Sequence, residues 1–317
     1  MKKEDLDRYL FDYSIELGFC GYGAIPAHLF TMEREYLERS LLNSYNGSMT
    51  YLSRNMEIRE NPALLLEGAR SIIVLLIPYK PAKKQLPEYP GIASYAYGED
   101  YHGLVKERLR MLASKLNLFY PDARYRVFTD SAPIFEKALA VKAGLGFIGR
   151  NTLLINKREG LHTFIGVIIT DVPLKYNEEI VPGGCGSCRR CLDACPTGAL
   201  VSEYVLDSRL CISYRTIECK NEEKLLYPEI ERAGMIFGCD RCLDACPWTT
   251  RGEPTEWPGF LPLKYHNGES ILTLDNNEWQ SMTEETFSSV FKKSPLSRAG
   301  LSKIKSNLNS ISKSQKK

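Results

Sequence analysis

The first 178 residues alternate between two hydrophobic periodicities, one typical of helices and one typical of buried strands. Apolar residues recur at helical spacing from Leu6 to Leu17, and Gly18 follows as a stop. Residues 71–78 form an uninterrupted apolar run, which predicts a central strand buried on both faces. The other predicted elements are a helix over about 103–118 and strands over 125–129, 151–156 and 163–170. Strands that alternate with helices predict a layered α/β or α+β domain.

One further helix is predicted to open at Asp130-Ser-Ala-Pro133 and to close at Gly144. Ser131 can cap its N-terminus, and Pro133 suits its first turn. In this interpretation Asp130 is an ordinary capping residue.

Composition changes near Asn177. Nine of the ten cysteines lie between Pro182 and Pro247, and the tenth is Cys20. The N-terminus carries acids and no apolar run suited to a signal peptide, and no run is long enough to span a bilayer. We therefore expect a cytoplasmic protein without membrane contact, in which cysteines are metal ligands rather than disulfides.

Charge is distributed unevenly. Residues 291–317 hold eight Lys or Arg and no acid, which leaves the rest of the chain at a net −6 within a total of +2. A basic tail on an acidic body indicates a polyanionic partner, whereas a solvated terminus is the alternative.

The spacing of the cysteines indicates the kind of metal site that they form. Cys185-x2-Cys188-x2-Cys191-x3-Cys195-Pro196 has the pattern of bacterial ferredoxins, in which the fourth cysteine ligates the other cluster. A second run, Cys239-x2-Cys242-x3-Cys246-Pro247, is one cysteine short, and Cys211 completes the count. We predict one [4Fe–4S] cluster on Cys185, Cys188, Cys191 and Cys246, and a second on Cys195, Cys211, Cys239 and Cys242. A pair of zinc sites is the alternative, which the x2-x2-x3 spacing disfavours. Cys20 and Cys219 are left as structural residues.

Two clusters form an electron-transfer chain, which needs an electron acceptor at its end. Gly144-x-Gly146-x-x-Gly149 has the letters of a dinucleotide motif but follows a predicted helix rather than a strand. The acceptor is therefore expected to be another cofactor, or a substrate, held by residues 1–178.

Several ordered motifs resemble those of the epoxyqueuosine reductases, and the resemblance covers nearly the whole chain. They are Arg59-Glu-Asn-Pro62, Gly98-Glu-Asp-Tyr-His102, Thr129-Asp-Ser-Ala-Pro133, Glu136-Lys-Ala-Leu, residues 143–149, Asn151-Thr, the first cysteine run through Ala199, residues 206–214 and residues 238–248.

This resemblance implies an α+β fold, with a nitroreductase-like cobalamin-binding domain followed by a bacterial ferredoxin-like module for two [4Fe–4S] clusters. The expected boundaries are 1–178 for the catalytic domain, 179–260 for the cluster module and 261–317 for a C-terminal extension. The implied activity is the two-electron reduction of epoxyqueuosine to queuosine in tRNA. Low-potential clusters suit cobalamin, which must be strongly reduced.

The resemblance also implies site residues. Asp130 would donate the proton that epoxide opening requires, and burial would have to raise its pKa for that role. The implied cobalamin contacts are Arg59, Asp130, Leu154, Ile165, Ile168 and Ser213, of which the aliphatic members suit a hydrophobic core equally well. His102 could face the cobalamin or pack in the core.

The expected partners are the tRNA anticodon stem-loop and a low-potential electron donor such as a ferredoxin or flavodoxin, with the chain a monomer. Longer family members add a helical-repeat domain that holds tRNA, and the sequence has none after Arg298. The basic tail is therefore predicted to supply phosphate contacts. The alternative functions are a cobalamin-dependent reductive dehalogenase, which usually uses a tyrosine acid, and a ferredoxin-type electron carrier.

Overall fold

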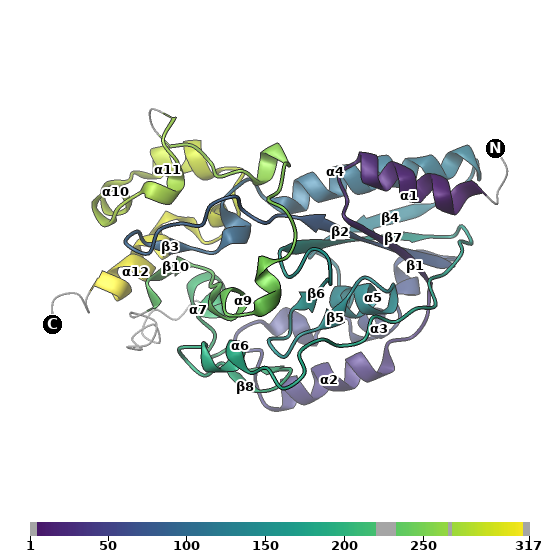
Figure 1. Cartoon of the computed structure of the whole chain (residues 1–317), viewed down its shortest axis with the longest axis horizontal. Coiled ribbons are helices and arrows are strands. Elements are labelled where there is room, and N and C mark those ends of the chain that lie inside the picture. The colour runs from purple at the N-terminus through teal and green to yellow at the C-terminus, as the bar shows by residue number, and fades with distance from the viewer. Residues whose placement is uncertain (1–4, 220–232, 266–267, 313–317) are drawn as a thin grey trace.

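The computed structural model describes residues 5–219, 233–265 and 268–312. Its centre is a four-stranded antiparallel sheet in the order β1-β2-β7-β4 (Figure 1). The strands are β1 (Gly21–Pro26), β2 (Ser71–Pro78), β7 (Thr163–Thr170) and β4 (Tyr125–Phe128). The predicted strands over 71–78, 125–129 and 163–170 are thus confirmed. The antiparallel pairing identifies the fold as α+β.

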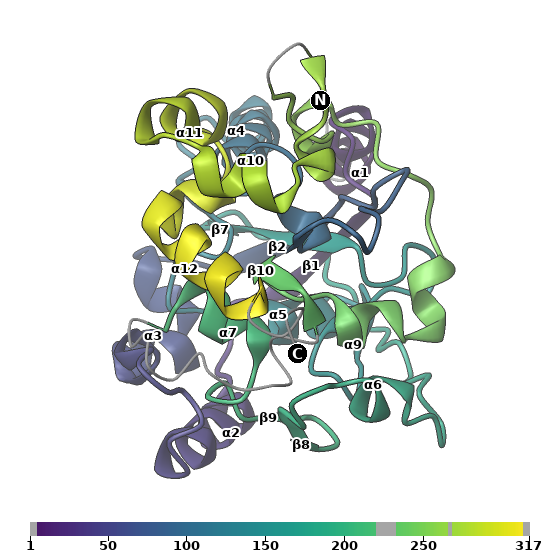
Figure 2. The same cartoon turned by 90° about the vertical axis from the view of Figure 1, so that its left-hand side faces the viewer.

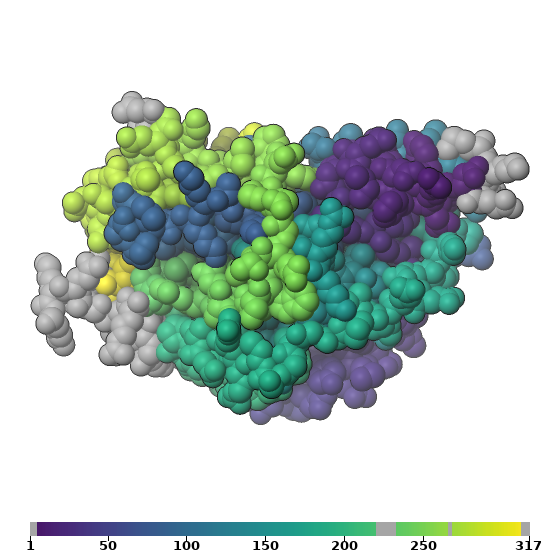
Figure 3. All heavy atoms as spheres, in the orientation of Figure 1, coloured from purple at the N-terminus to yellow at the C-terminus, as the bar shows by residue number. Residues whose placement is uncertain are grey.

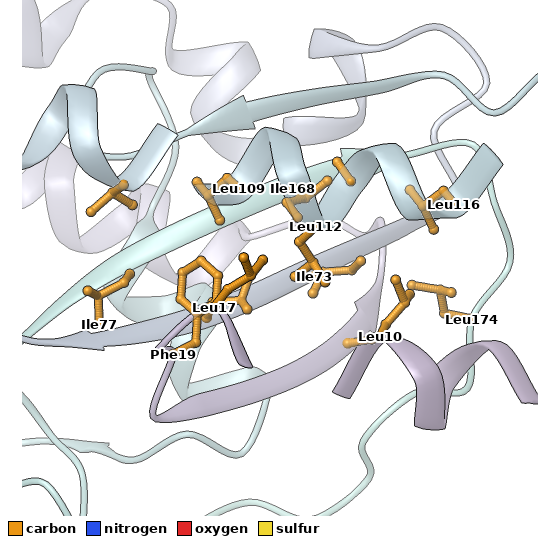
Figure 4. Packing of buried hydrophobic residues seen from close by; sticks show 14 of the residues in the cluster. Leu10, Leu17, Phe19, Ile73, Ile77, Leu109, Leu112, Leu116, Ile168 and Leu174 are labelled. Carbon is orange, nitrogen blue, oxygen red and sulfur yellow. The ribbon is translucent and has the colours of Figure 1, made fainter. Parts of the chain in front are cut away.

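Both faces of the sheet are covered, which explains why β2 is apolar at nearly every position. Helices α1 (Leu6–Glu16) and α4 (Tyr101–Ser114) pack on one face, where Ile73 and Leu112 are fully buried (Figure 4). Helix α5 (Glu136–Lys142) packs on the other face, against Val74 and Val167. Truncating one such buried leucine to alanine typically costs about 2–5 kcal/mol.

Two predicted elements are shorter in the structure than expected. Helix α5 begins at Glu136 rather than at Ser131, so residues 130–135 form a loop and neither Ser131 nor Pro133 caps it. The strand predicted over 151–156 contracts to β6 (Leu154–Ile155), which pairs with β5 (Phe147–Ile148). Helices α2 (Thr31–Leu42) and α3 (Met56–Glu60) lie between β1 and β2 in the chain.

The cysteine-rich segment consists of short elements joined by turns. They are α6 (Arg190–Asp193), β8 (Leu200–Ser202), β9 (Val205–Leu206), α7 (Ile212–Ile217), β10 (Met235–Phe237) and α9 (Arg241–Asp244). Strand β10 pairs in parallel with β3 (Gly91–Ile92), which joins this segment to the N-terminal half of the chain.

The C-terminal residues form a second hydrophobic core rather than a loose tail (Figure 2). Helices α10 (Asn276–Ser281), α11 (Glu284–Phe291) and α12 (Gly300–Ser312) bury Trp279, Phe291 and Ile304 completely. Asn307 of α12 donates hydrogen bonds to the carbonyl oxygens of Thr216 and Ile236, at 2.9 and 2.8 Å.

The alternative of a solvated terminus is therefore wrong for residues 291–311. The remaining basic residues of the tail, Lys313, Lys316 and Lys317, lie outside the described residues. Removing Lys303 and everything after it would remove most of α12, so such a truncation cannot isolate the effect of charge.

Candidate active site and cluster-binding module

Four cysteines from both motifs converge at one end of the cluster-binding segment. We call Cys185, Cys188, Cys191 and Cys246 set one. They line a cavity of about 300 Å³ together with Arg150, Asn151, Ile155, Gly184, Pro247, Trp248 and Arg251. Burial raises the pKa of the Cys246 thiol, and the charges of its three partners in the set raise it further. The last cysteine of the second motif thus lies with the first three of the first motif.

The last cysteine of the first motif lies in turn with the first two of the second motif and with Cys211. We call these residues, Cys195, Cys211, Cys239 and Cys242, set two. Burial raises the pKa of Cys242, and the charges of the other three add to the shift. Burial likewise raises the pKa of Cys239, to about 12. The surroundings of set two include Tyr79, whose pKa is raised by its own complete burial and by charges that include Cys242. Set two therefore lies beside Tyr79, and its four cysteines are half-buried.

The spacing of these thiols bears on the zinc alternative. Four thiolates on one zinc ion stand about 3.8 Å apart, given a Zn–S distance of about 2.3 Å. Within residues 5–219, 233–265 and 268–312, no group of three or more Cys, His, Asp or Glu side chains stands at the spacing of a single-ion site. Cys20 and Cys219 belong to neither set: the Cys20 thiol donates to the carbonyl oxygen of Leu76 at 3.4 Å.

Asp130 lies in the loop between β4 and α5. Its φ of +47° is a left-handed backbone conformation that is uncommon for a residue other than glycine. Both ends of the loop are fixed: Thr129 Oγ1 donates to the carbonyl oxygen of Ile165 at 2.8 Å, and the N–H of Asp130 donates to Glu136 Oε1 at 2.6 Å. The carboxylate does not cap α5, so the interpretation of Asp130 as a helix cap is wrong.

The carboxylate of Asp130 accepts a hydrogen bond from the Tyr101 hydroxyl at 2.5 Å. Burial and then the charge of Asp130 raise the pKa of Tyr101, so the phenol stays protonated and can donate. The Asp130 side chain itself is 67% exposed. The expectation of a buried Asp130 is therefore wrong for this structure, and Tyr101 is the neighbour that orients the carboxylate.

His102 connects Asp130 to two further charged residues. Its Nδ1 lies 2.7 Å from Asp100 Oδ1, and its Nε2 lies 3.3 Å from the Asp130 carbonyl oxygen and 3.9 Å from Asp130 Oδ2. Arg298 Nη2 lies 2.7 Å from the same Nδ1, so this nitrogen faces a donor as well as an acceptor. Arg298 Nη2 donates to Asp100 Oδ2 at 2.8 Å. Burial alone would raise the pKa of Asp100, but His102 and Arg298 outweigh it and lower the pKa to about 2.

Two charged residues of α5 lie beside the Asp130 loop, and we call this loop, these two residues and the nearby parts of β6 and β7 the Asp130 region. Desolvation lowers the pKa of Lys137, although its side chain keeps contact with solvent. Lys137 Nζ donates to the carbonyl oxygen of Thr152 at 2.7 Å. Thr152 has φ +66°, which is strained for a β-branched residue. Burial, and then the charge of Asp130, raise the pKa of Glu136 to about 8.

The other residues expected to contact a cofactor lie in different elements. Leu154 of β6 and Ile165 of β7 pack on the α5 face of the sheet. Arg59 of α3 is buried and donates to the carbonyl oxygens of Arg54 and Tyr51, at 3.3 and 3.2 Å. Ser213 lies on α7, which is next to set two and begins after Cys211.

Ile168 is the exception among these residues. Side chains alternate along a strand, and Ile168 is fully buried under α1 and α4, on the opposite face from Ile165. Its side chain cannot reach a group bound near Ile165, so this expected contact is corrected.

The loop before α3 lies against α7. The N–H of Ser48 donates to the Tyr214 hydroxyl at 2.7 Å, and Ser48 Oγ lies 2.8 Å from the same oxygen. Burial, and then the charges of Glu218 and Asp130, raise the pKa of Tyr51. Tyr51 therefore stands within electrostatic reach of both the Asp130 loop and α7, so the Asp130 region adjoins the cluster-binding segment.

Comparison with known proteins agrees with this geometry. The family model described as "Epoxyqueuosine reductase QueG, DUF1730" matches residues 59–131, which include Arg59, Tyr101 and Asp130. The model described as "4Fe-4S double cluster binding domain" matches residues 184–249, which include all eight cysteines of the two sets. An epoxyqueuosine reductase of Cellulophaga algicola is 37% identical over 93% of this chain and 94% of its own length. This chain belongs to the epoxyqueuosine reductase family.

Other relatives and solved structures agree with membership of this oxidoreductase family. The Escherichia coli epoxyqueuosine reductase is 35% identical over 91% of this chain and 76% of its own. A crystal structure of a selenomethionine-labelled epoxyqueuosine reductase superposes with a TM-score of 0.86, at 25% identity, over 97% of this chain and 81% of that one. A second, solved with an epoxyqueuosine-modified tRNA-Tyr stem loop, gives 0.85 at 26% identity over the same shares.

For a member of this family, the alternatives of a reductive dehalogenase and a ferredoxin-type carrier are set aside. The fold extends over the chain as a nitroreductase-like sheet domain with a double-cluster module. None of the helices in the described part of the chain combines the length and apolar character that a bilayer crossing requires.

The sequence did not identify four residues of this site. In the sequence, Glu136 and Lys137 stand out only as part of a motif, and Tyr101 only as a neighbour of His102. Arg298 lies 198 positions from Asp100 along the chain, so no local pattern could have paired them. The available signal for Tyr101 and Glu136 was their place in motifs that resemble those of the family.

Proposed function

We propose that this chain reduces the epoxide of epoxyqueuosine in tRNA to the alkene of queuosine. The reaction takes two electrons and two protons, cleaves two C–O bonds and releases the oxygen as water. The observation that carries the proposal is the Asp130 carboxylate, held by Tyr101 and His102 in a chain that also gathers eight cysteines into two sets.

The two sets are proposed as the ligands of two [4Fe–4S] clusters, with Cys246 completing set one and Cys211 completing set two. Because the ferredoxin pattern sends the fourth cysteine of a motif to the other cluster, the exchange between motifs supports this assignment. Set two lies beside α7, whose Tyr214 contacts the loop before α3, and this position supports an order in which electrons pass from set one to set two and then to the acceptor.

The Asp130 region is proposed as a cobalamin site. Apolar side chains at Leu154 and Ile165, a hydroxyl at Ser213 and the cations Arg59 and Lys137 would hold the cofactor, and they suit a large amphipathic group. Cobalamin bound there would supply a low-potential metal centre that accepts electrons from the clusters. The assignment is supported by the exposure of Asp130 and by the hydrogen bonds that fix its loop beside Ile165.

Asp130 is proposed as the general acid. Epoxide opening leaves an alkoxide, and a carboxylic acid at hydrogen-bonding distance can protonate that oxygen. Each turnover consumes two protons, so Asp130 must be reprotonated. His102 is the proposed source, because its Nε2 lies 3.9 Å from Asp130 Oδ2. Asp100 and Arg298 are positioning residues in this proposal, since they hold Nδ1 of the same ring.

The proposed partners are the tRNA anticodon stem-loop and a low-potential electron carrier of the ferredoxin or flavodoxin class. Because the modified base must reach the Asp130 region, we propose that it flips out of its stack. A tRNA-modifying reductase is expected to work in the cytoplasm, as a monomer.

The test is anaerobic conversion of an epoxyqueuosine-containing stem-loop by the cobalamin-loaded holoenzyme, followed by mass analysis of the nucleosides. The wild-type chain should form queuosine. Asp130→Asn should retain both clusters and bound cobalamin but lose turnover by about 10²–10⁴-fold, as expected for removal of a general acid. Absence of queuosine with the wild-type chain would overturn the proposed reaction, and near-normal turnover by the variant would remove Asp130 from the acid role.

A further inference from the structure

Set one lies beneath a surface that has little side-chain cover. The loop that precedes and contains Cys185 is exposed at Gly183, Gly184 and Gly186. A Cβ added at Gly183 or Gly186 would meet no atom within 4 Å. A partner could therefore approach the backbone of this loop closely. Close approach matters for an electron carrier, because the rate of electron tunnelling falls exponentially with the distance between centres.

Cations surround this loop. Arg189 and Arg190 adjoin Cys188 and Cys191, and both are exposed. Arg251 is exposed, and its guanidinium lies over the Trp248 ring at 5.7 Å. The turn that carries Lys157 and Arg158 adjoins Arg251, since a Cβ at Gly160 would lie 3.3 Å from the Arg251 Cβ.

We call these cations and the glycines of the loop the set-one face. In Figure 3, the segments that carry α6 and α9 adjoin on the side toward the viewer.

The acids of this region offset only part of the positive charge. Asp193 lies 3.9 Å from Arg189, Glu203 pairs with Arg150 at 2.7 Å, and Glu159 pairs with Arg158 at 3.2 Å. Glu253 is exposed beyond Arg251. Within the described part of the chain, Arg190 has neither an ion pair nor a hydrogen bond from its side chain. The set-one face is therefore positive, although residues 1–290 as a whole are negative.

We propose that the set-one face is the docking surface for an acidic, low-potential electron-transfer protein, which reduces the chain through set one. The inference rests on the proposed function, because it needs set one to bind a redox cluster. Each docking event would transfer one electron from the carrier to the chain, so two events supply one turnover. The protons come separately, from the Asp130 side.

Charge and position both favour this occupant. Small acidic carriers are steered to positive surfaces, which raises their association rate by about 10–10³-fold at low salt. A tRNA phosphate backbone would also be attracted by the arginines. Binding of tRNA does not require a backbone surface that is bare of side chains directly over set one. The Asp130 region, which must receive the base in the proposed function, adjoins set two instead.

Gly183 allows a sharp test, because a side chain there has open space and the residue has no left-handed φ. Gly183→Glu places a negative charge on the set-one face without an internal clash, and Gly183→Lys is the matched control of similar length. Arg190→Glu gives an independent charge reversal on the same face.

The assay measures turnover with reduced flavodoxin as the donor, and again with dithionite, at several salt concentrations. Gly183→Glu and Arg190→Glu should each raise the KM for flavodoxin about 3–10-fold at low salt, with the effect shrinking as salt rises. Gly183→Lys should leave that KM unchanged or lower it. Turnover with dithionite and affinity for the stem-loop should stay at wild-type values for all three variants.

Three outcomes would overturn the docking surface. They are an unchanged flavodoxin KM in both acidic variants, an equal effect of Gly183→Lys and Gly183→Glu, and a loss confined to stem-loop affinity, which would assign the face to tRNA. Failure of the wild-type chain to form queuosine even with dithionite would instead refute the proposed reaction.

Discussion

Replacing Asp100 by asparagine tests the proton-delivery network without removing any group proposed to touch the substrate. Asp100 has two roles in the structure. Its Oδ1 caps helix α4 by accepting from the N–H of His102 at 3.0 Å, and its charge pairs with His102 and Arg298. Asparagine is about as good an N-cap as aspartate, so Asp100→Asn removes the charge and leaves the cap.

The magnitude follows from the pKa of Asp100, which is lowered from 3.8 to about 2. At about 1.4 kcal/mol per pKa unit, the charged network stabilises the folded state by about 2 kcal/mol at neutral pH. A carboxyl with a depressed folded-state pKa contributes fully above its unfolded pKa. That contribution is lost as the pH falls from about 4 toward 2. The difference between wild type and variant should therefore shrink as the pH falls from about 4 toward 2.

Chemical unfolding of the holoenzyme measures this difference in stability. The matched control is Asp275→Asn, because Asp275 also caps a helix, α10, through the N–H of Glu278 at 2.8 Å but has no cationic partner among the described residues. The control should lose a few tenths of a kcal/mol at most. Equal losses in the two variants, or a difference that stays the same as the pH falls from about 4 toward 2, would refute the assignment of charge to this network.

Kinetics separate positioning from mere stability. If Asp100 holds His102 as a proton source for Asp130, Asp100→Asn should lower kcat about 10-fold and leave the KM for the stem-loop unchanged, in holoenzyme shown to be fully folded under the assay conditions. A residue that only stabilises the fold would leave kcat per folded molecule unchanged. The groups that face His102 in this region are Asp100, Asp130 and Arg298, and Tyr101 packs on its ring at 4.2 Å between centroids.

Two further predictions follow from the same geometry. Cys246→Ala should remove or convert the cluster of Cys185, Cys188 and Cys191 and leave the other cluster intact in electron paramagnetic resonance spectra. Iron near four atoms per wild-type chain, or no spectral effect of the substitution, would contradict the exchange between motifs. For Glu136, whose pKa is raised from 4.5 to about 8, the stabilising contribution is present below pH 4.5 and is lost as the pH rises through 8. Glu136→Gln should therefore flatten the fall in unfolding free energy between about pH 5 and pH 8, and a parallel pH dependence in both proteins would show that Glu136 does not titrate there.

The parts of the fold that were predictable from sequence are those set by local patterns. The apolar run over 71–78 is a strand over the same residues, and Gly18, with φ +84°, follows helix α1 as expected. The cysteine spacing predicted two groups of four because the reach of a short loop is a local property. The structure brings the same residues together in the same two groups.

The parts that were not predictable depend on contacts between distant residues. The segment after Asp130 has the letters of a helix start, but the Glu136 carboxylate reaches back to the Asp130 N–H and holds six residues in a loop. The basic residues near the C-terminus masked an apolar stripe at Leu301, Ile304, Leu308 and Ile311, which is buried against β10 and its neighbours. The basic residues were the more conspicuous pattern in the sequence, but the packing of the apolar stripe determines that this segment folds as a helix.

The arrangement separates the supply of electrons from the supply of protons. The cysteine sets lie on α6, α7, α9 and the turns beside them, whereas the acid and its partners lie at the start of α4 and on the loop before α5. A strongly reduced centre that met a ready proton donor along its electron path would lose electrons to protons. The C-terminal segment contacts the proposed proton-donor side, since Arg298 holds Asp100 and the carbonyl oxygen of Lys293 accepts from the Asp100 N–H at 2.5 Å. Its packed core fixes the start of α4, from which Tyr101 and His102 reach Asp130, and in the proposed function it would therefore serve proton transfer as well as stability.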